Sequence, residues 1–245
     1  MIEQTVEIAT PHGATTTFIV HPERDGAHPA VLFFMDAPAI REELRDMARR
    51  IAAAGYYVML PNLYYRSGVM ELADLPQLPE AESRARMFEL MGSLTIPLVM
   101  TDGDGILDFA DRDPAASNGK IATLGYCMSG QYAINFAARY PDRVAAAASI
   151  YGVQLVTDQA DSPHLAAQKA KAELYFACAE HDPYAPIEMV EALDQTVKSK
   201  NLNAEVELYS GVHHGFAFPQ RAVYDKPAAE RHWERLFALW RRRLG

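Results

Sequence analysis

Short apolar runs bounded by turn residues alternate with helical patterns along most of the chain, and this alternation constrains the fold more than any other feature. Runs of this kind are typical of buried strands, and a helix between two of them indicates a βαβ unit. A succession of such units predicts an α/β fold with a mostly parallel central sheet flanked by helices. The predicted strands cover Ala30–Phe34, Tyr57–Leu60, Ile121–Tyr126, Ala145–Tyr151, Ala172–Ala177 and Ala204–Tyr209. The predicted helices cover Arg41–Ala54, Glu80–Met91, Thr101–Asp111, Ser129–Arg139, Ile187–Lys198 and Ala228–Leu244.

The N-terminal segment has a different pattern from the rest of the chain. Thr5–Ala9 and Thr15–His21 are β-prone runs on either side of a Pro-His-Gly turn at residues 11–13. This arrangement predicts an antiparallel hairpin at the edge of the sheet. The chain has 245 residues and no break in composition. It is therefore predicted to form a single domain over residues 1–245.

The charge balance argues against two classes of partner. The chain has 23 basic and 32 acidic residues, which gives a formal net charge of -9. Nucleic-acid binders and anionic-membrane binders need a basic face, so neither partner is expected. The basic cluster Arg241–Arg243 ends a predicted helix, where arginines complement the helix dipole. The first residues lack the pattern of a signal peptide and no run has membrane-spanning length, so we expect a cytoplasmic protein.

The segment Ile121–Gly130 ends an apolar run in a turn of small residues with one thiol at its tip. A strand that turns sharply into a helix exposes the residue at the turn and needs small neighbours two positions away, here Gly125 and Ser129. The N-terminus of the following helix would favour the thiolate of Cys127. Cys127 is therefore the candidate nucleophile, and a buried core cysteine is the alternative. The second cysteine, Cys178, lies within an apolar run and is predicted to belong to the core.

A thiol nucleophile needs a base, and the base needs an acid that orients it. Asp182 follows one predicted strand, and Glu180 is an alternative acid two residues earlier. His213 and His214 follow the last predicted strand, and the residues alone do not choose between them. Nucleophile, acid and histidine in this chain order are typical of an α/β-hydrolase triad, with sulfur in place of the usual hydroxyl.

A metal site is the competing interpretation of the same polar residues. His181, Asp182, His213 and His214 are all potential ligands. Their spacing matches no zinc motif, and no cysteine is close to them in the sequence. We therefore expect neither a metal nor a cofactor.

Over nearly its whole length the chain resembles the dienelactone hydrolases, also called carboxymethylenebutenolidases. The resemblance rests on four short motifs that lie at comparable places along the chain. They are Gly-Tyr-Cys-Met-Ser-Gly at 125–130, Pro-Asn-Leu-Tyr-Tyr-Arg at 61–66, His-Asp-Pro-Tyr-Ala-Pro at 181–186 and His-Gly-Phe at 214–216.

This resemblance assigns roles to the catalytic candidates. It implies that Cys127 is the nucleophile, that Asp182 is the acid, and that His214, the histidine directly before Gly-Phe, is the base. It also implies an oxyanion hole formed by two backbone N–H groups, one of Met128 after the nucleophile and one of Ala37 in an earlier loop. Neither backbone group needs a particular side chain.

The same resemblance points to residues around the substrate. A carboxylate that contacts the resting thiol is implied at Asp36, where the family usually has the longer glutamate. Arg84 matches the first of two arginines that hold a substrate carboxylate, with Arg86 close by as an alternative. The second arginine is replaced by Phe218, which favours a less anionic or larger ester or lactone.

The expected function is hydrolysis of lactones or activated esters through a thioester on the Cys-His-Asp triad. The leaving group is expelled before water, activated by the histidine, cleaves the thioester. Two alternatives use the same residues: a broad-specificity esterase, and a noncatalytic protein whose thiol responds to oxidants. The expected partner is a small-molecule substrate, and the chain is expected to be a monomer or a small homo-oligomer.

Overall fold

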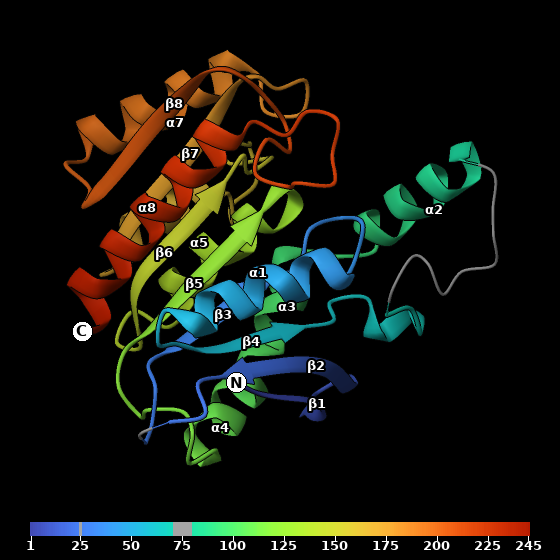
Figure 1. Cartoon of the computed structure of the whole chain (residues 1–245). Helices are drawn as coiled ribbons and strands as arrows, with labels where there is room; N and C mark the ends of the chain where they lie inside the picture. The colour runs from blue at the N-terminus through green and yellow to red at the C-terminus, as the bar shows by residue number, and fades with distance from the viewer. Residues whose placement is uncertain (25, 71–79) are drawn as a thin grey trace. The chain divides into compact units, whose positions relative to one another are not determined.

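The computed structural model describes residues 1–24, 26–70 and 80–245, which fall into two compact units, Met1–Gly119 and Lys120–Gly245. Each unit combines strands with helices, as the alternating sequence pattern predicts (Figure 1). Within the described residues, no helix is both long and apolar enough to cross a membrane. The prediction of one domain over the whole chain stays a prediction.

The first unit contains the predicted N-terminal hairpin. Strands β1 (Ile2–Thr10) and β2 (Gly13–His21) pair antiparallel, with Thr10 opposite Gly13 at the turn. Along the sheet the order is β1, β2, β4 (Tyr57–Pro61) and β3 (Ala30–Phe34), and the pair β3 and β4 is parallel. The helical segments are α1 (Glu42–Ala53), η1 (Tyr65–Ser67), α2 (Glu80–Gly92), α3 (Ile96–Thr101) and α4 (Gly103–Arg112).

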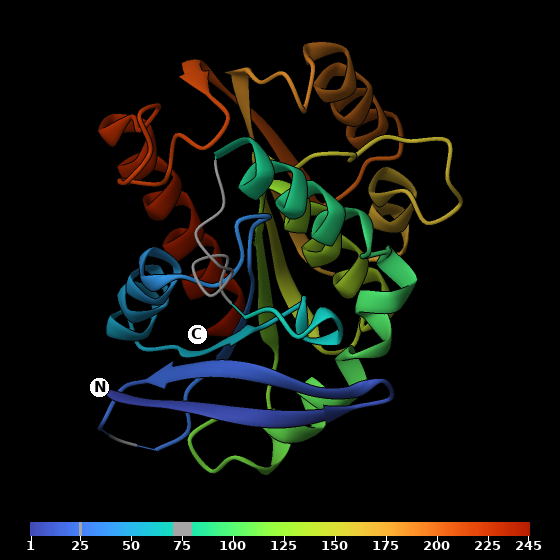
Figure 2. The same ribbon diagram turned by 90° about the vertical axis from the view of Figure 1, so that its right-hand side faces the viewer.

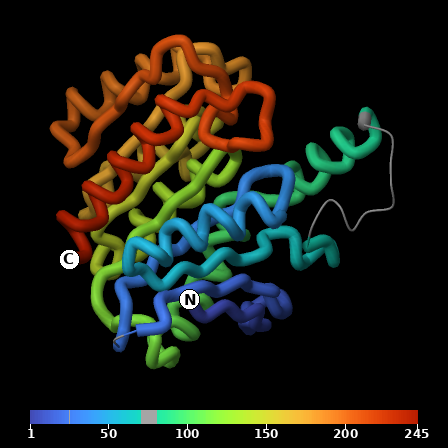
Figure 3. The backbone as a smooth tube through the Cα atoms, viewed as in Figure 1, coloured from blue at the N-terminus to red at the C-terminus, as the bar shows by residue number. Residues whose placement is uncertain are grey.

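The second unit is built on four parallel strands in the order β5, β6, β7 and β8. Helix α8 lies on one side of these strands, and α5 and α7 lie on the other (Figure 2). The path of α8 back along the strands can be followed in red in Figure 3. The strands are β5 (Ile121–Tyr126), β6 (Val144–Ile150), β7 (Glu173–His181) and β8 (Ala204–His213). The helical segments are η3 (Cys127–Ser129), α5 (Gly130–Arg139), α6 (Pro163–Ala166), η4 (Ala167–Lys169), α7 (Ile187–Ser199) and α8 (Lys226–Leu244).

Continuous apolar runs explain why β5 and β6 lie in the core of the second unit. Strands β5 and β6 are buried along nearly their whole length, as expected for parallel strands covered on both faces. Because all four strands are parallel, their carboxyl ends lie at the same edge. Residues that follow β5, β7 and β8 can therefore meet there.

Strands β7 and β8 run to His181 and His213, beyond the predicted ends at Ala177 and Tyr209. Their pairing shifts register between Ala179 and His181, which marks a β-bulge. The bulge contains Gly211, whose φ of 74° lies in the left-handed region that favours glycine. The Glu180 carboxylate accepts hydrogen bonds from two groups of the bulge, the Ser210 hydroxyl at 2.7 Å and the Gly211 N–H at 2.6 Å.

Candidate active site

The predicted elbow is present between β5 and α5. Cys127 adopts a φ of 53°, a strained conformation for a residue with a side chain, and its carbonyl accepts a hydrogen bond from the Val153 N–H at 3.1 Å. A Cβ atom on Gly125 would lie 2.0 Å from the carbonyl oxygen of Ser129, so the crossing of strand and helix requires glycine there. The cysteine side chain is half-buried at the tip of this turn. The chain conformation therefore presents one thiol at the carboxyl end of β5.

A second group at the same edge is a hydrogen-bonded pair of Asp182 and His214. Asp182 Oδ2 lies 2.6 Å from His214 Nδ1, and the Asp182 side chain is completely buried. Its other oxygen, Oδ1, accepts backbone N–H bonds from Tyr184 at 2.9 Å and Ala185 at 3.1 Å. Because both carboxylate oxygens are engaged, the acid is fixed in orientation and holds the imidazole through Nδ1. The Nδ1 proton is assigned from the acceptor that faces it.

The imidazole of His214 is enclosed by two aromatic rings. The ring of Tyr151 lies 4.9 Å away and that of Tyr184 lies 5.0 Å away, both in edge-on orientation. Tyr151 is completely buried, whereas Tyr184 is 47% exposed and can be reached from solvent. The histidine is therefore held on one side by the core and bordered on the other by an accessible aromatic ring.

The protonation of His214 depends on its two polar neighbours. Burial alone would lower its pKa, but the hydrogen bond with Asp182 and the nearby Cys127 thiol outweigh burial and raise the pKa to about 9. Among the described residues, no hydrogen bond of ordinary geometry reaches Nε2, which is buried. The sulfur thus influences the ring electrostatically without completing a well-formed bond, a looseness common in sites without substrate. Nε2 is therefore the ring nitrogen of His214 that the Asp182 bond leaves unoccupied.

The structure separates the alternatives that the sequence left open. Glu180, the alternative acid, binds the β-bulge through Ser210 and Gly211 rather than a histidine. His213 packs against His181, with ring centroids 5.1 Å apart, while His214 takes the bond to Asp182. The geometry therefore brings together Asp182 and His214, and these two are the acid and the histidine that the family resemblance selects.

The first unit holds the remaining predicted polar residue, Asp36. Its carboxylate is fully buried and forms an ion pair with Arg41, with Nη1 to Oδ1 at 2.6 Å and Nη2 to Oδ2 at 3.3 Å. Arg41 also contacts Glu43 at 2.8 Å. Nothing in the sequence pattern singled out Arg41, because a partner five residues away in a loop follows no periodicity. The expected contact of Asp36 with the thiol stays a prediction.

The loop that carries Ala37 is held in shape by the Pro-Asn-Leu-Tyr-Tyr-Arg motif. The Tyr64 hydroxyl donates a 2.9 Å hydrogen bond to the Ala37 carbonyl oxygen, and both residues are buried. Asn62 in turn accepts a hydrogen bond from the Tyr64 N–H at 2.9 Å. The motif therefore fixes the backbone segment that carries Ala37.

The predicted substrate residues have contrasting environments. Arg84 is exposed on α2 with its guanidinium 5.6 Å from the Phe88 ring, and Arg86 forms a 2.6 Å ion pair with Glu89. Phe218 is completely buried, and the Arg221 guanidinium lies 4.8 Å from its ring centroid.

The second cysteine has the environment of a core residue, as predicted. Cys178 on β7 is 3% exposed, and burial raises the pKa of its thiol to about 12. Such a thiol stays protonated at neutral pH and cannot act as a nucleophile. Cys178 is therefore a natural control for Cys127.

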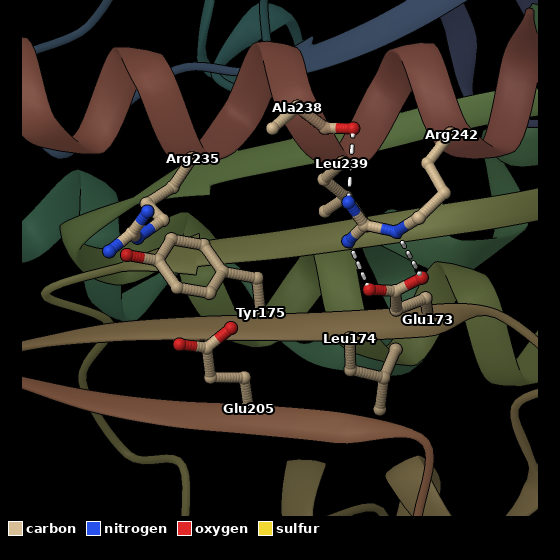
Figure 4. Close-up of a pocket in the computed structure, with 8 residues that line it drawn as sticks. All are labelled: Glu173, Leu174, Tyr175, Glu205, Arg235, Ala238, Leu239 and Arg242. Atoms are coloured by element: carbon tan, nitrogen blue, oxygen red, sulfur yellow. Dashed lines mark hydrogen bonds and ion pairs between the residues drawn. The ribbon is translucent and has the colours of Figure 1, made fainter.

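A separate pocket of about 240 Å³ lies where α8 passes over β7 and β8. Two of its charged groups are paired with each other: Arg242 binds Glu173, and it also binds the Ala238 carbonyl oxygen at 3.2 Å (Figure 4). The residues that line this pocket do not include Cys127, Asp182 or His214. This pocket is therefore distinct from the candidate active site.

Comparison with known proteins matches the chain to one family. The sequence pattern of the dienelactone hydrolase family matches residues 15–244. A protein of Salmonella typhi, provisionally named carboxymethylenebutenolidase, is 28% identical over 216 residues, which cover 86% of this chain and 76% of that protein.

Solved structures give the same result at the level of the fold. A provisionally named dienelactone hydrolase from Klebsiella pneumoniae matches with a TM-score of 0.86 at 24% identity, covering 98% of each chain. A dienelactone hydrolase-like promiscuous phosphotriesterase from metagenomic libraries matches with a TM-score of 0.79 at 17% identity, again covering 98% of each chain. The predicted α/β-hydrolase fold is therefore confirmed.

Proposed function

Because the chain belongs to the dienelactone hydrolase family, whose enzymes hydrolyse ester and lactone bonds, we propose that it hydrolyses activated esters or lactones through a thioester on Cys127. The observation that carries the proposal is the 2.6 Å bond between Asp182 Oδ2 and His214 Nδ1, which leaves Nε2 beside the thiol of a strained elbow. Nucleophile, base and orienting acid all belong to the second unit.

The resting state in this proposal is an ion pair. With a pKa of about 9, His214 is an imidazolium at neutral pH when the thiolate of Cys127 lies beside it. The thiolate is the nucleophilic form of cysteine, and the neighbouring imidazolium favours it. Asp182 stabilises the imidazolium and fixes which nitrogen faces the sulfur.

Acylation begins when the thiolate of Cys127 attacks the carbonyl carbon of the substrate. The carbonyl electrons move to oxygen, and backbone N–H groups of Met128 and Ala37 are the proposed donors to that oxyanion. As the intermediate collapses, the bond to the leaving oxygen breaks, and His214 Nε2 gives its proton to that oxygen. The products of this half-reaction are an alcohol or enol and a thioester.

Formation of the thioester also prepares the histidine for the second half-reaction. The sulfur loses its negative charge, so the favourable charge interaction that helps raise the pKa of His214 disappears. The neutral imidazole can then take a proton from water, whose oxygen attacks the thioester. The thiolate leaves, and the proton held by His214 restores the resting pair. The same residue thus serves as acid and then as base.

The chemistry of sulfur narrows the substrate class. A tetrahedral intermediate with one sulfur and one oxygen substituent expels the better leaving group, and a thiolate leaves more easily than an ordinary alkoxide. Productive collapse therefore requires a stabilised leaving group, such as an enolate or phenolate. We infer that enol-lactones and aryl esters are better substrates than alkyl esters or amides.

Recognition of the substrate is proposed to involve two different kinds of residue. Arg84 is the proposed partner of a substrate carboxylate. Phe218 is buried, and its ring lies 6.0 Å from Tyr151, which itself lies 4.9 Å from His214. We therefore propose that Phe218 supports the aromatic wall behind the histidine without touching the substrate.

The two cysteines provide the test of this function. We expect p-nitrophenyl acetate hydrolysis by the wild type to stop after treatment with iodoacetamide. Cys127→Ala should abolish hydrolysis with little loss of stability, whereas Cys178→Ala should retain hydrolysis and unfold at lower temperature, as truncation of a buried residue requires. Hydrolysis that survives in Cys127→Ala would contradict the proposal.

A further inference from the structure

Two histidines lie side by side at the carboxyl ends of β7 and β8 and have no part in the proposed mechanism. His181 is the last residue of β7, His213 is the last residue of β8, and they are direct partners in the pairing register. Both residues are exposed, and their ring centroids are 5.1 Å apart with the planes tilted by 42°. The pair therefore presents two neighbouring imidazoles to solvent.

That separation suits one metal ion shared between the rings. Zinc binds imidazole nitrogen at ~2.0–2.1 Å, and two rings on one ion at a tetrahedral angle have centroids roughly 5 Å apart. The observed 5.1 Å agrees with this value. Imidazole is a ligand of choice for zinc and its neighbours in the first transition row.

The sequence spacing alone gives no reason to expect a metal; from this geometry we propose that His181 and His213 bind a divalent transition-metal ion of the zinc type. Among residues 1–24, 26–70 and 80–245, no group of three or more acidic, cysteine or histidine side chains could hold a metal, so solvent completes the coordination. The site is thus a two-histidine clamp that is independent of the elbow thiol.

Hydrogen bonds hold the backbone next to the clamp without any ion. The two histidines sit directly after the β-bulge whose Ser210 and Gly211 groups are bound by Glu180. Rigid strand ends reduce the ordering that binding requires. Because His181 precedes Asp182 and His213 precedes His214, a bound ion would also tie together the two segments that carry the acid and the histidine of the proposed triad.

The test uses Zn²⁺ as the probe and a background without the reactive thiol. In Cys127→Ala protein, titration calorimetry should give one Zn²⁺ per chain, and Zn²⁺ should raise the melting temperature. Adding His181→Ala or His213→Ala should weaken binding at least about tenfold, the smallest effect usual for loss of even an outer-shell partner of a metal ligand. The thermal shift should disappear in both double variants.

A matched control and a second pair of variants keep the result unambiguous. His12→Ala, which removes an exposed histidine of the first unit, should leave Zn²⁺ binding and the thermal shift unchanged. If an alanine variant fails to fold, His181→Gln and His213→Gln remove the imidazole while retaining a polar side chain. Absence of Zn²⁺ binding in the Cys127→Ala background would overturn the proposal, and so would binding that both histidine variants retain.

Discussion

Replacement of Asp182 by asparagine tests the proposed acid with the smallest change in shape. Asp182 Oδ1 accepts the N–H groups of Tyr184 and Ala185, and the asparagine carbonyl oxygen can keep both bonds. The amide NH₂ then takes the place of Oδ2 and faces His214 Nδ1, which must become an acceptor. The proton of the neutral ring therefore moves to Nε2, where it blocks acceptance of a proton from water. The fold should be preserved while proton transfer fails.

The expected fall in the pKa of His214 follows from the loss of its hydrogen bond to the charged Asp182 carboxylate. A hydrogen bond to a charged group contributes about 1.5–3 kcal/mol, and about 1.4 kcal/mol corresponds to one pKa unit. The pKa of His214, about 9 in the wild type, should therefore fall by about one to two units in Asp182→Asn. We also expect kcat for an aryl ester to fall at least about a hundredfold, the lower range for a positioned acid–base group.

Two measurements and one control decide this prediction. The pH dependence of Cys127 alkylation by iodoacetamide reports the loss of the His214 proton beside the sulfur, and steady-state hydrolysis of p-nitrophenyl acetate reports kcat. Glu180→Gln is the matched control, because this neighbouring acid binds Ser210 and Gly211 instead of a histidine, and it should leave both readings nearly unchanged. An unaltered alkylation profile in Asp182→Asn, or an equal loss of kcat in Glu180→Gln, would refute the reasoning.

Three further predictions follow from the same geometry. His214→Ala should lower kcat for an aryl ester at least about a hundredfold. His213→Ala should lower kcat much less, because His214 and not His213 holds the bond to Asp182. Steady-state kinetics that reverse this order would exclude His214 as the base. Arg84→Ala should raise KM for an acidic lactone by about one to two decades, the value of a charge-assisted bond, and leave KM for an uncharged ester unchanged. Equal KM values for Arg84→Ala and wild type would remove Arg84 from the site and make the alternative, Arg86→Ala, the next variant to measure. The pKa of His214 is raised to about 9 in the folded state, so its contribution to stability, about 3 kcal/mol, is fully present below about pH 6.5 and is lost as the pH rises toward 9. Urea unfolding of wild type and His214→Gln should therefore show a difference in unfolding free energy that shrinks over this pH range. A difference that stays constant would contradict the raised pKa.

The parts of the site that follow from chain order could be predicted from the sequence. Gly125 and Cys127 lie at the end of an apolar run, and Asp182 and His214 follow two later runs. Parallel strands bring such positions to one edge of the sheet whatever the details of packing. A bond between an acid after one strand and a histidine after another could therefore be anticipated from the sequence, but the choices of Asp182 over Glu180 and of His214 over His213 needed the family resemblance.

Features created by packing could not be predicted in this way. Strands β7 and β8 extend past their apolar runs because Glu180 binds the bulge at Ser210 and Gly211, and no hydrophobic periodicity reports such a bond. The ion pair between Asp36 and Arg41 likewise arises in a loop without a regular pattern.

Helix boundaries show the same limit. The helix predicted over Thr101–Asp111 corresponds to α4, which begins at Gly103, and the preceding helix α3 over Ile96–Thr101 was not predicted. Helix α3 has only six residues and is capped by the Thr95 side chain, which accepts the Leu98 N–H at 3.3 Å. Such a short apolar segment with proline near its start has too little periodicity to be distinguished from a loop.

The central claim is that Cys127 carries the acyl group during turnover, and rapid-quench analysis of p-nitrophenyl acetate hydrolysis tests it most directly. The account predicts a burst of p-nitrophenol that approaches one per chain, together with a single acetyl group that peptide mapping by mass spectrometry locates on Cys127. An acetyl group found on another residue, or full turnover while Cys127 remains unmodified at every quench time and no burst is seen, would contradict the account.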